Sequence, residues 1–74
     1  MLKLQVLCHK GDEEFIKETP EEMEDLISKI EMGELETFER GKYYIVDKNT
    51  NTVIAKRELK EGQELVMVPV IAGG

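Results

Sequence analysis

The chain has 74 residues, of which 41% are hydrophobic and 35% charged, which predicts a single small domain with a modest core. Sixteen acidic residues outnumber ten basic ones, giving a net charge of −6; this disfavours nucleic acid, whose phosphates need Lys and Arg to replace their counterions. No apolar run approaches the roughly 20 residues that span a bilayer. The start of the chain has no signal-peptide pattern, and one cysteine excludes an internal disulfide. We therefore expect a cytoplasmic protein with no nucleic-acid or membrane partner.

Cysteine and histidine are scarce, and the many carboxylates show no recognisable catalytic spacing. The only cysteine, Cys8, is followed by the only histidine, His9. Adjacent strand residues point to opposite faces, so this pair cannot converge on a metal or act as nucleophile and base. We expect Cys8 in the core and His9 at the surface. No glycine-rich phosphate loop is present. The sequence therefore predicts no stand-alone enzyme and no bound metal or cofactor.

The first two elements in chain order are strands. Apolar and polar residues alternate over residues 2–8, which is the period of a half-buried strand. A turn at 10–12 precedes a second short strand at 13–18, so the two segments are expected to form a hairpin.

A helix follows the hairpin. Thr19 is a candidate N-cap, Pro20 fits the first helical position, and Glu22 completes a capping box. Four apolar residues then share one helix face; they are Met23, Leu26, Ile27 and Ile30. Gly33 is the expected stop.

The rest of the chain predicts a connector and three further strands. The connector covers residues 34–40, where Leu35 and Phe38 are expected to pack. Strands are expected at 42–47, 52–55 and 65–71, separated by turns at 49–51 and 60–63. Pro69 has to lie near a strand end or edge, because it lacks an N–H. Met23, Met32 and Met67 are expected in the core rather than at a cofactor surface.

These elements give the order strand, strand, helix, strand, strand, strand. The fold class is α+β, with one helix packed on a mixed sheet of four to five strands. The first and last strands are the most apolar, so we expect them side by side at the centre. Residues 1–71 form one domain and residues 72–74 a C-terminal tail.

Charge is unevenly distributed along the chain. Residues 1–39 hold twelve acidic and four basic side chains, whereas residues 40–74 hold four and six. One interpretation is that these are solvated faces; the other is a polarised surface that orients a partner.

The end of the chain carries the strongest functional signal. No charged residue follows Glu64, and the sequence ends in Gly73 and Gly74. Two residues without Cβ can enter a narrow channel and present the carboxylate of Gly74 to an enzyme far from the folded body. Activation there would be attack on the α-phosphate of ATP, followed by displacement of AMP by a sulfur nucleophile. Two terminal glycines can also arise by chance.

The element order and the tail resemble a known family. The order matches the ubiquitin-like β-grasp, and the tail Val70-Ile71-Ala72-Gly73-Gly74 is similar to that of the thiamine-pathway sulfur carriers. The segment from Leu59 to Leu65, running into Val68-Pro69, resembles the same carriers and the small subunits of molybdopterin synthase, which usually have two consecutive prolines where this chain has one. The resemblance implies that a partner related to ubiquitin-activating enzymes adenylates Gly74 with ATP. The product is a thiocarboxylate that donates sulfur in thiamine, molybdenum cofactor or related biosynthesis to a sulfur-accepting synthase.

Two other functions fit the same tail. Prokaryotic ubiquitin-like modifiers form an isopeptide bond between the terminal glycine and a lysine of a target protein, and some phage tail-assembly proteins contain a β-grasp segment.

Docking of the activating partner is expected beside the tail. If Leu65 and Met67 face the helix, strand alternation turns Val66 and Val68 to the outer face of the sheet, where Tyr43 or Tyr44 could join them. The predicted docking residues are Val66, Val68, Pro69, Val70, Ile71 and Ala72.

Overall fold

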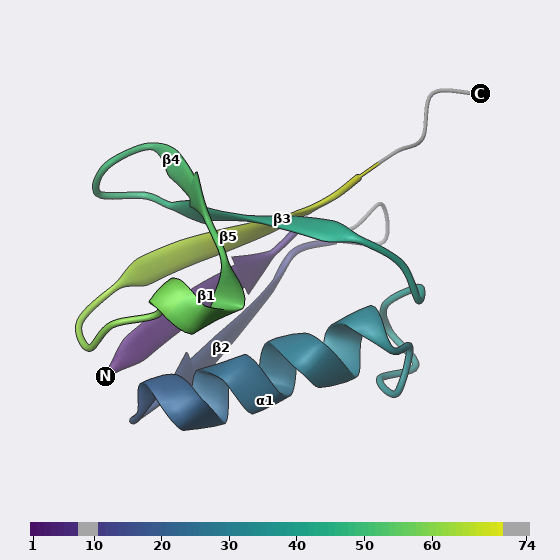
Figure 1. The fold of residues 1–74 in the computed structure, drawn as a ribbon. Helices are drawn as coiled ribbons and strands as arrows, with labels where there is room; N and C mark the ends of the chain where they lie inside the picture. The colour runs from purple at the N-terminus through teal and green to yellow at the C-terminus, as the bar shows by residue number, and fades with distance from the viewer. Residues whose placement is uncertain (8–10, 71–74) are drawn as a thin grey trace.

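The computed structural model describes residues 1–7 and 11–70. One helix packs against one face of a five-stranded mixed sheet, which is an α+β arrangement (Figure 1). The strands are β1 (Leu2–Val6), β2 (Glu13–Lys17), β3 (Tyr43–Asp47), β4 (Thr52–Ile54) and β5 (Glu64–Pro69), and the helix is α1 (Pro20–Glu31). The predicted order of elements is confirmed.

The first and last strands lie side by side in the sheet, as predicted. The spatial order is β2-β1-β5-β3-β4. β1 and β5 are parallel, with Leu4 opposite Leu65, whereas the β1–β2, β3–β4 and β3–β5 pairs are antiparallel. Because β5 is flanked on both sides, its last residues leave the sheet from an interior strand.

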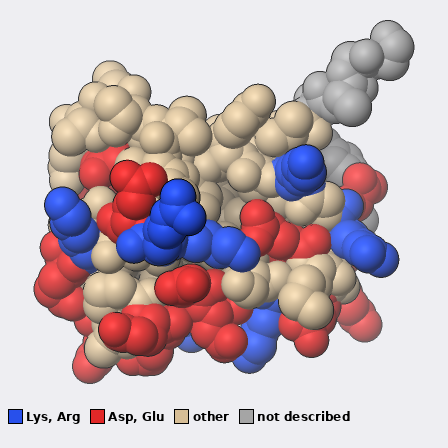
Figure 2. Space-filling view, in the orientation of Figure 1, with Lys and Arg blue, Asp and Glu red and all other residues tan. Residues whose placement is uncertain are grey.

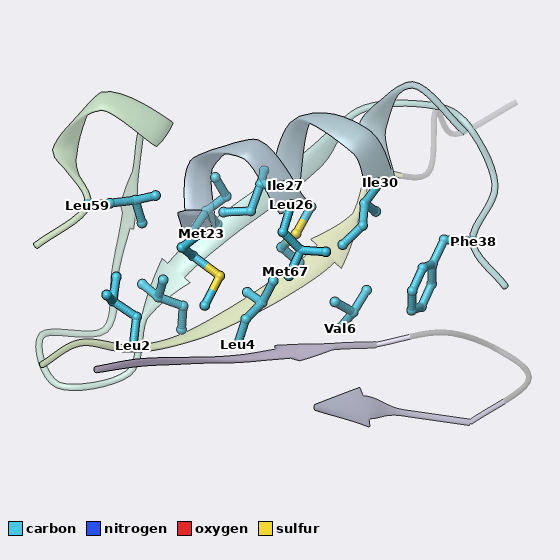
Figure 3. Close-up of a cluster of buried hydrophobic side chains, with 12 residues drawn as sticks. Leu2, Leu4, Val6, Met23, Leu26, Ile27, Ile30, Phe38, Leu59 and Met67 are labelled. Atoms are coloured by element: carbon cyan, nitrogen blue, oxygen red, sulfur yellow. The ribbon is translucent and has the colours of Figure 1, made fainter. Parts of the chain in front are cut away.

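The core lies between α1 and one face of the sheet. It contains the four predicted helix residues and the inward residues of β1 and β5, together with Phe38, Ile45 and Leu59. Figure 3 shows Phe38 at the end of this core near Val6 and Leu59 at the end near Leu2. Met23 and Met67 are buried as predicted, but Met32 is 64% exposed; the prediction for Met32 was wrong, because the helix ends at Glu31 and Met32 caps it outside the apolar stripe.

The ends of α1 follow the sequence signals. The Thr19 hydroxyl accepts a hydrogen bond from the Glu22 N–H at 3.2 Å and donates to the Glu22 carboxylate at 3.1 Å, which is a variant of the predicted cap. At the other end the Gly33 and Glu34 N–H groups donate to Ile30 and Lys29. With Gly33 at φ +75°, this is a Schellman motif.

The remaining differences are local. A 3₁₀ helix, η1 (Lys56–Glu58), follows β4 and was not predicted. The Lys56 Nζ atom lies 2.8 Å from the Glu31 carboxylate and donates to the Ser28 hydroxyl at 3.3 Å, which joins η1 to α1. β5 begins one residue earlier than predicted and ends at Pro69, which places the residue without an N–H at a strand end.

Candidate functional site

The outer face of the sheet, opposite α1, carries five uncharged side chains on three adjacent strands. The backbone register pairs Tyr44 with Val68, and pairs Val46 with both Val66 and Val53. Side chains of directly paired residues lie on the same face. We call this set the outer apolar patch; its members are Tyr44, Val46, Val53, Val66 and Val68.

The patch is open to solvent at its margins. Val53 is 63% exposed and Tyr44 51% exposed, whereas the other three members are half-buried. Side chains of one sheet face that lie across three neighbouring strands form a continuous surface. Contiguous exposed apolar surface of this kind is typical of a protein–protein contact.

Charged residues border the patch at the end where β5 begins. Lys3 Nζ lies 3.8 Å from the Glu14 carboxylate, and Lys48 Nζ lies 4.0 Å from that of Glu64. These four side chains are exposed, so the two ion pairs add little stability. The apolar surface is therefore confined to the half of the sheet that contains the C-terminal end of β5.

Charged side chains are unevenly spread over the face drawn in Figure 2. Most acidic and basic atoms lie over the helix side and the middle of the molecule, while the uppermost rim of the view is mainly uncharged. The outer apolar patch is a surface that a partner can cover without desolvating charges of the patch itself.

The structure separates the predicted docking residues into groups. Val66 and Val68 lie in the outer apolar patch with Tyr44, whereas Tyr43 packs against the core. Pro69 pairs with Tyr43 and, by strand alternation, lies on the face opposite to Val68. Pro69 and Val70 instead line a hollow at the end of β5. Ile71, Ala72, Gly73 and Gly74 lie outside the described residues, as do Cys8 and His9.

Val46 and Val53 were missed as patch members by sequence reasoning. Both residues lie in predicted strands, but these strands contain unbroken apolar runs, so no alternation shows which side chains face outward. Their place on the outer face becomes clear only from the pairing of β3 with both β4 and β5.

The connector between α1 and β3 is held firmly where β5 ends. The Gly41 N–H donates to the Glu31 carbonyl at 3.1 Å, and the Val70 N–H donates to the Lys42 carbonyl at 2.9 Å. The Tyr43 hydroxyl donates to the Glu39 carbonyl at 2.6 Å. These bonds join the helix end, the connector and the residue after β5 in one hydrogen-bonded unit.

Replacement of Gly33 by alanine is expected to loosen this unit. Its φ is +75°, and an added Cβ would lie 2.8 Å from the Cβ of Arg40 and 3.4 Å from its Cα. The left-handed conformation costs a residue with a side chain about 1–2 kcal/mol, and the overpacking adds about 1–3 kcal/mol. Chemical denaturation measures the loss.

Gly62→Ala is the matched control for this substitution. Gly62 has φ +82° but nothing within 4 Å of an added Cβ. The Gly62→Ala variant should therefore lose only the stability that the left-handed conformation costs, without the overpacking. Equal losses of unfolding free energy in the two variants would contradict the close approach of Gly33 and Arg40.

The described residues form neither a metal-binding cluster nor a membrane-spanning helix. In residues 1–7 and 11–70, no group of three or more His, Cys, Asp or Glu side chains is placed to hold a metal ion. Over the same ranges, no helix has the length and apolar character needed to cross a membrane.

Comparison with known proteins does not assign the chain to a family. Searches against protein-family models, curated proteins and solved structures each found no match. A functional interpretation therefore rests on the residues themselves.

Proposed function

We propose that this protein is a cytoplasmic sulfur carrier with a ubiquitin-like β-grasp fold. Its reactive group is the C-terminal carboxylate of Gly74. The proposal makes it a substrate of other enzymes rather than an enzyme. The observation that carries it is the position of β5: an interior strand, parallel to β1, runs past the outer apolar patch into a sequence that ends in two glycines. A strand held on both sides is a firm base from which to present a carboxylate to a partner.

The chemistry requires only the C-terminal carboxylate. A carboxylate oxygen of Gly74 attacks the α-phosphorus of ATP, and pyrophosphate leaves. Hydrosulfide, or an equivalent sulfur nucleophile, then attacks the carbonyl carbon and displaces AMP, which leaves a thiocarboxylate. ATP is bound by the activating partner, which is related to ubiquitin-activating enzymes; the carrier itself binds no cofactor. Gly73 acts as a spacer because its lack of a Cβ fits a narrow channel.

The outer apolar patch is the proposed docking surface for the activating partner. It lies on the half of the sheet that contains the C-terminal end of β5. A partner that covers Tyr44, Val66 and Val68 would also be positioned to hold the residues that follow Val70. Apolar residues at the centre of an interface contribute most of its binding energy.

The intact mass of the protein purified from its own host tests the proposal. Under conditions that preserve thiocarboxylates, we expect a species heavier by the difference between one sulfur and one oxygen, which disappears on alkaline or oxidative treatment. A blot of the same extract should show no heavier species.

Other outcomes of this measurement would assign a different function. A ladder of conjugates joined from Gly74 to lysines would identify a ubiquitin-like modifier instead. An unmodified mass and no conjugates, with ATP and candidate activating enzymes supplied, would leave a protein that acts by contact alone, such as an assembly protein, and would refute the carrier proposal.

A further inference from the structure

A hollow of about 240 Å³ lies beside the last described residues of the chain. It is lined by Glu39, Arg40, Gly41, Lys42, Tyr43, Pro69 and Val70. It sits at the end of β5 and is separate from the outer apolar patch, since Tyr43 and Pro69 belong to the opposite face. We call it the tail-base hollow.

The walls of the hollow are fixed by the backbone bonds already described. Gly41 is bound to the last residue of α1, and Lys42 is bound to Val70. Arg40 is held against Gly33 so closely that no Cβ fits between them. A site with walls held in this way loses little conformational entropy when it is occupied.

The charge of the hollow is opposite to that of the protein. Lys3, Lys29, Lys48 and Lys56 each form an ion pair with an acidic side chain. In the described part of the chain, no acidic side chain forms such a pair with Arg40 or Lys42, and both residues are exposed. These two cations outnumber the single carboxylate of Glu39, in a chain whose net charge is −6.

From this arrangement we infer that the tail-base hollow receives an acidic side chain from the activating partner, with Arg40 and Lys42 as its counter-charges. The inference rests on the proposed function and adds a second contact to it. The volume is below the roughly 300–1,000 Å³ of small-molecule pockets, which favours one or two side chains of a protein segment over a separate ligand. The apolar atoms of Tyr43, Pro69 and Val70 would contact the stem of that side chain.

The position of the hollow explains what the contact does. A partner that grips the residues after Val70 must pass this point, because Val70 is bound to Lys42 in the wall. Complementary charge at an exposed rim speeds association and sets orientation more than it adds affinity. The contact would therefore align the tail with the channel of the partner.

The test uses the first chemical step, which sulfur carriers and modifiers share. Purified chain is added to a clarified extract of its source organism with ATP and hydroxylamine. The hydroxylamine nitrogen attacks the acyl adenylate at Gly74, AMP leaves, and the resulting hydroxamate is measured by intact mass. For Arg40→Glu with Lys42→Glu, we expect the initial rate at limiting chain concentration to fall about tenfold or more at low salt. The difference should narrow as salt is raised, because salt screens exposed charges.

Arg57→Glu with Lys60→Glu is the matched control. It makes the same change in net charge at two exposed residues away from the hollow, and it should react at a rate near that of the wild type. If the double Glu variant at 40 and 42 fails to fold by circular dichroism, Arg40→Gln with Lys42→Gln replaces it, with a smaller loss expected.

The outcomes separate the two proposals. No hydroxamate from the wild type would refute adenylation of Gly74, and with it the proposed function. A wild type that reacts, together with an unchanged rate for the Arg40 and Lys42 variant, would refute the tail-base hollow alone. An equal loss in the Arg57 and Lys60 control, or a loss that does not depend on salt, would do the same.

Discussion

Replacement of Gly74 by valine is expected to abolish loading while leaving the fold intact. If the proposed activating partner holds the tail in a narrow channel, a branched side chain at the terminal residue would block it, so the thiocarboxylate species should disappear from the mass spectrum of protein purified from its host. The free energy of unfolding should stay within about 0.5 kcal/mol of the wild type, which is the usual range for substitutions away from the core.

Measuring the free energy of unfolding of the same variant separates a loss of loading from a loss of folding. A loaded fraction equal to that of the wild type would show that Gly74 is not the working residue. A large loss of stability would show instead that the terminal residues pack on the domain, contrary to the predicted tail. Gly74→Ala, which adds a single methyl group, should fall between wild type and valine in loading.

Placing acidic charge on the outer apolar patch is expected to have the second largest effect. In Tyr44→Glu with Val53→Glu, two exposed apolar side chains become carboxylates that a docked partner would have to desolvate. Burying a charged group without a partner costs about 2 kcal/mol or more, so the rate of hydroxamate formation at limiting chain concentration should fall about 30-fold.

Ile16→Glu is the control for this variant. Ile16 is 57% exposed and pairs with Lys3, so it lies on the same outer face but on the edge strand β2, outside the patch. Its rate should match that of the wild type. Equal losses in both variants would mean that any added negative charge slows the reaction, and the patch would then lose its proposed role.

Local signals were sufficient to predict most elements of the fold. The capping residues at Thr19 and Glu22, the apolar spacing that follows, and Gly33 fixed both ends of α1, because helix ends depend on bonds within a few residues. Alternation in the first strand, and short apolar segments bounded by turn signals for the other four, located all five strands to within about two residues at each end. The central pairing of β1 with β5 followed from their apolar character alone.

Features that depend on contacts between distant parts of the sequence could not be predicted from local patterns. The Ala55 N–H donates to the Glu58 carboxylate at 2.8 Å and closes η1 locally, but its place against α1 depends on the contact of Lys56 with Glu31, across 25 residues of sequence. The tail-base hollow requires Lys42 and Val70 to meet, and it emerges only when the connector lies beside the end of β5. Of the predicted site, Val66 and Val68 lie as expected, Pro69 belongs to the other face, and the four terminal residues stay a prediction.

The central position of β5 also governs how the molecule assembles. Without residues 64–69, β1 and β3 have no strand between them, and each presents an unpaired apolar edge. The hairpins β1–β2 and β3–β4 can form early from local contacts, but the sheet closes only when the most distant part of the chain inserts between them. Closure of such long loops is slow relative to local structure formation. An unfinished chain would thus be prone to edge-to-edge aggregation, and the outer apolar patch, which includes Val66 and Val68, would exist only once β5 is in place.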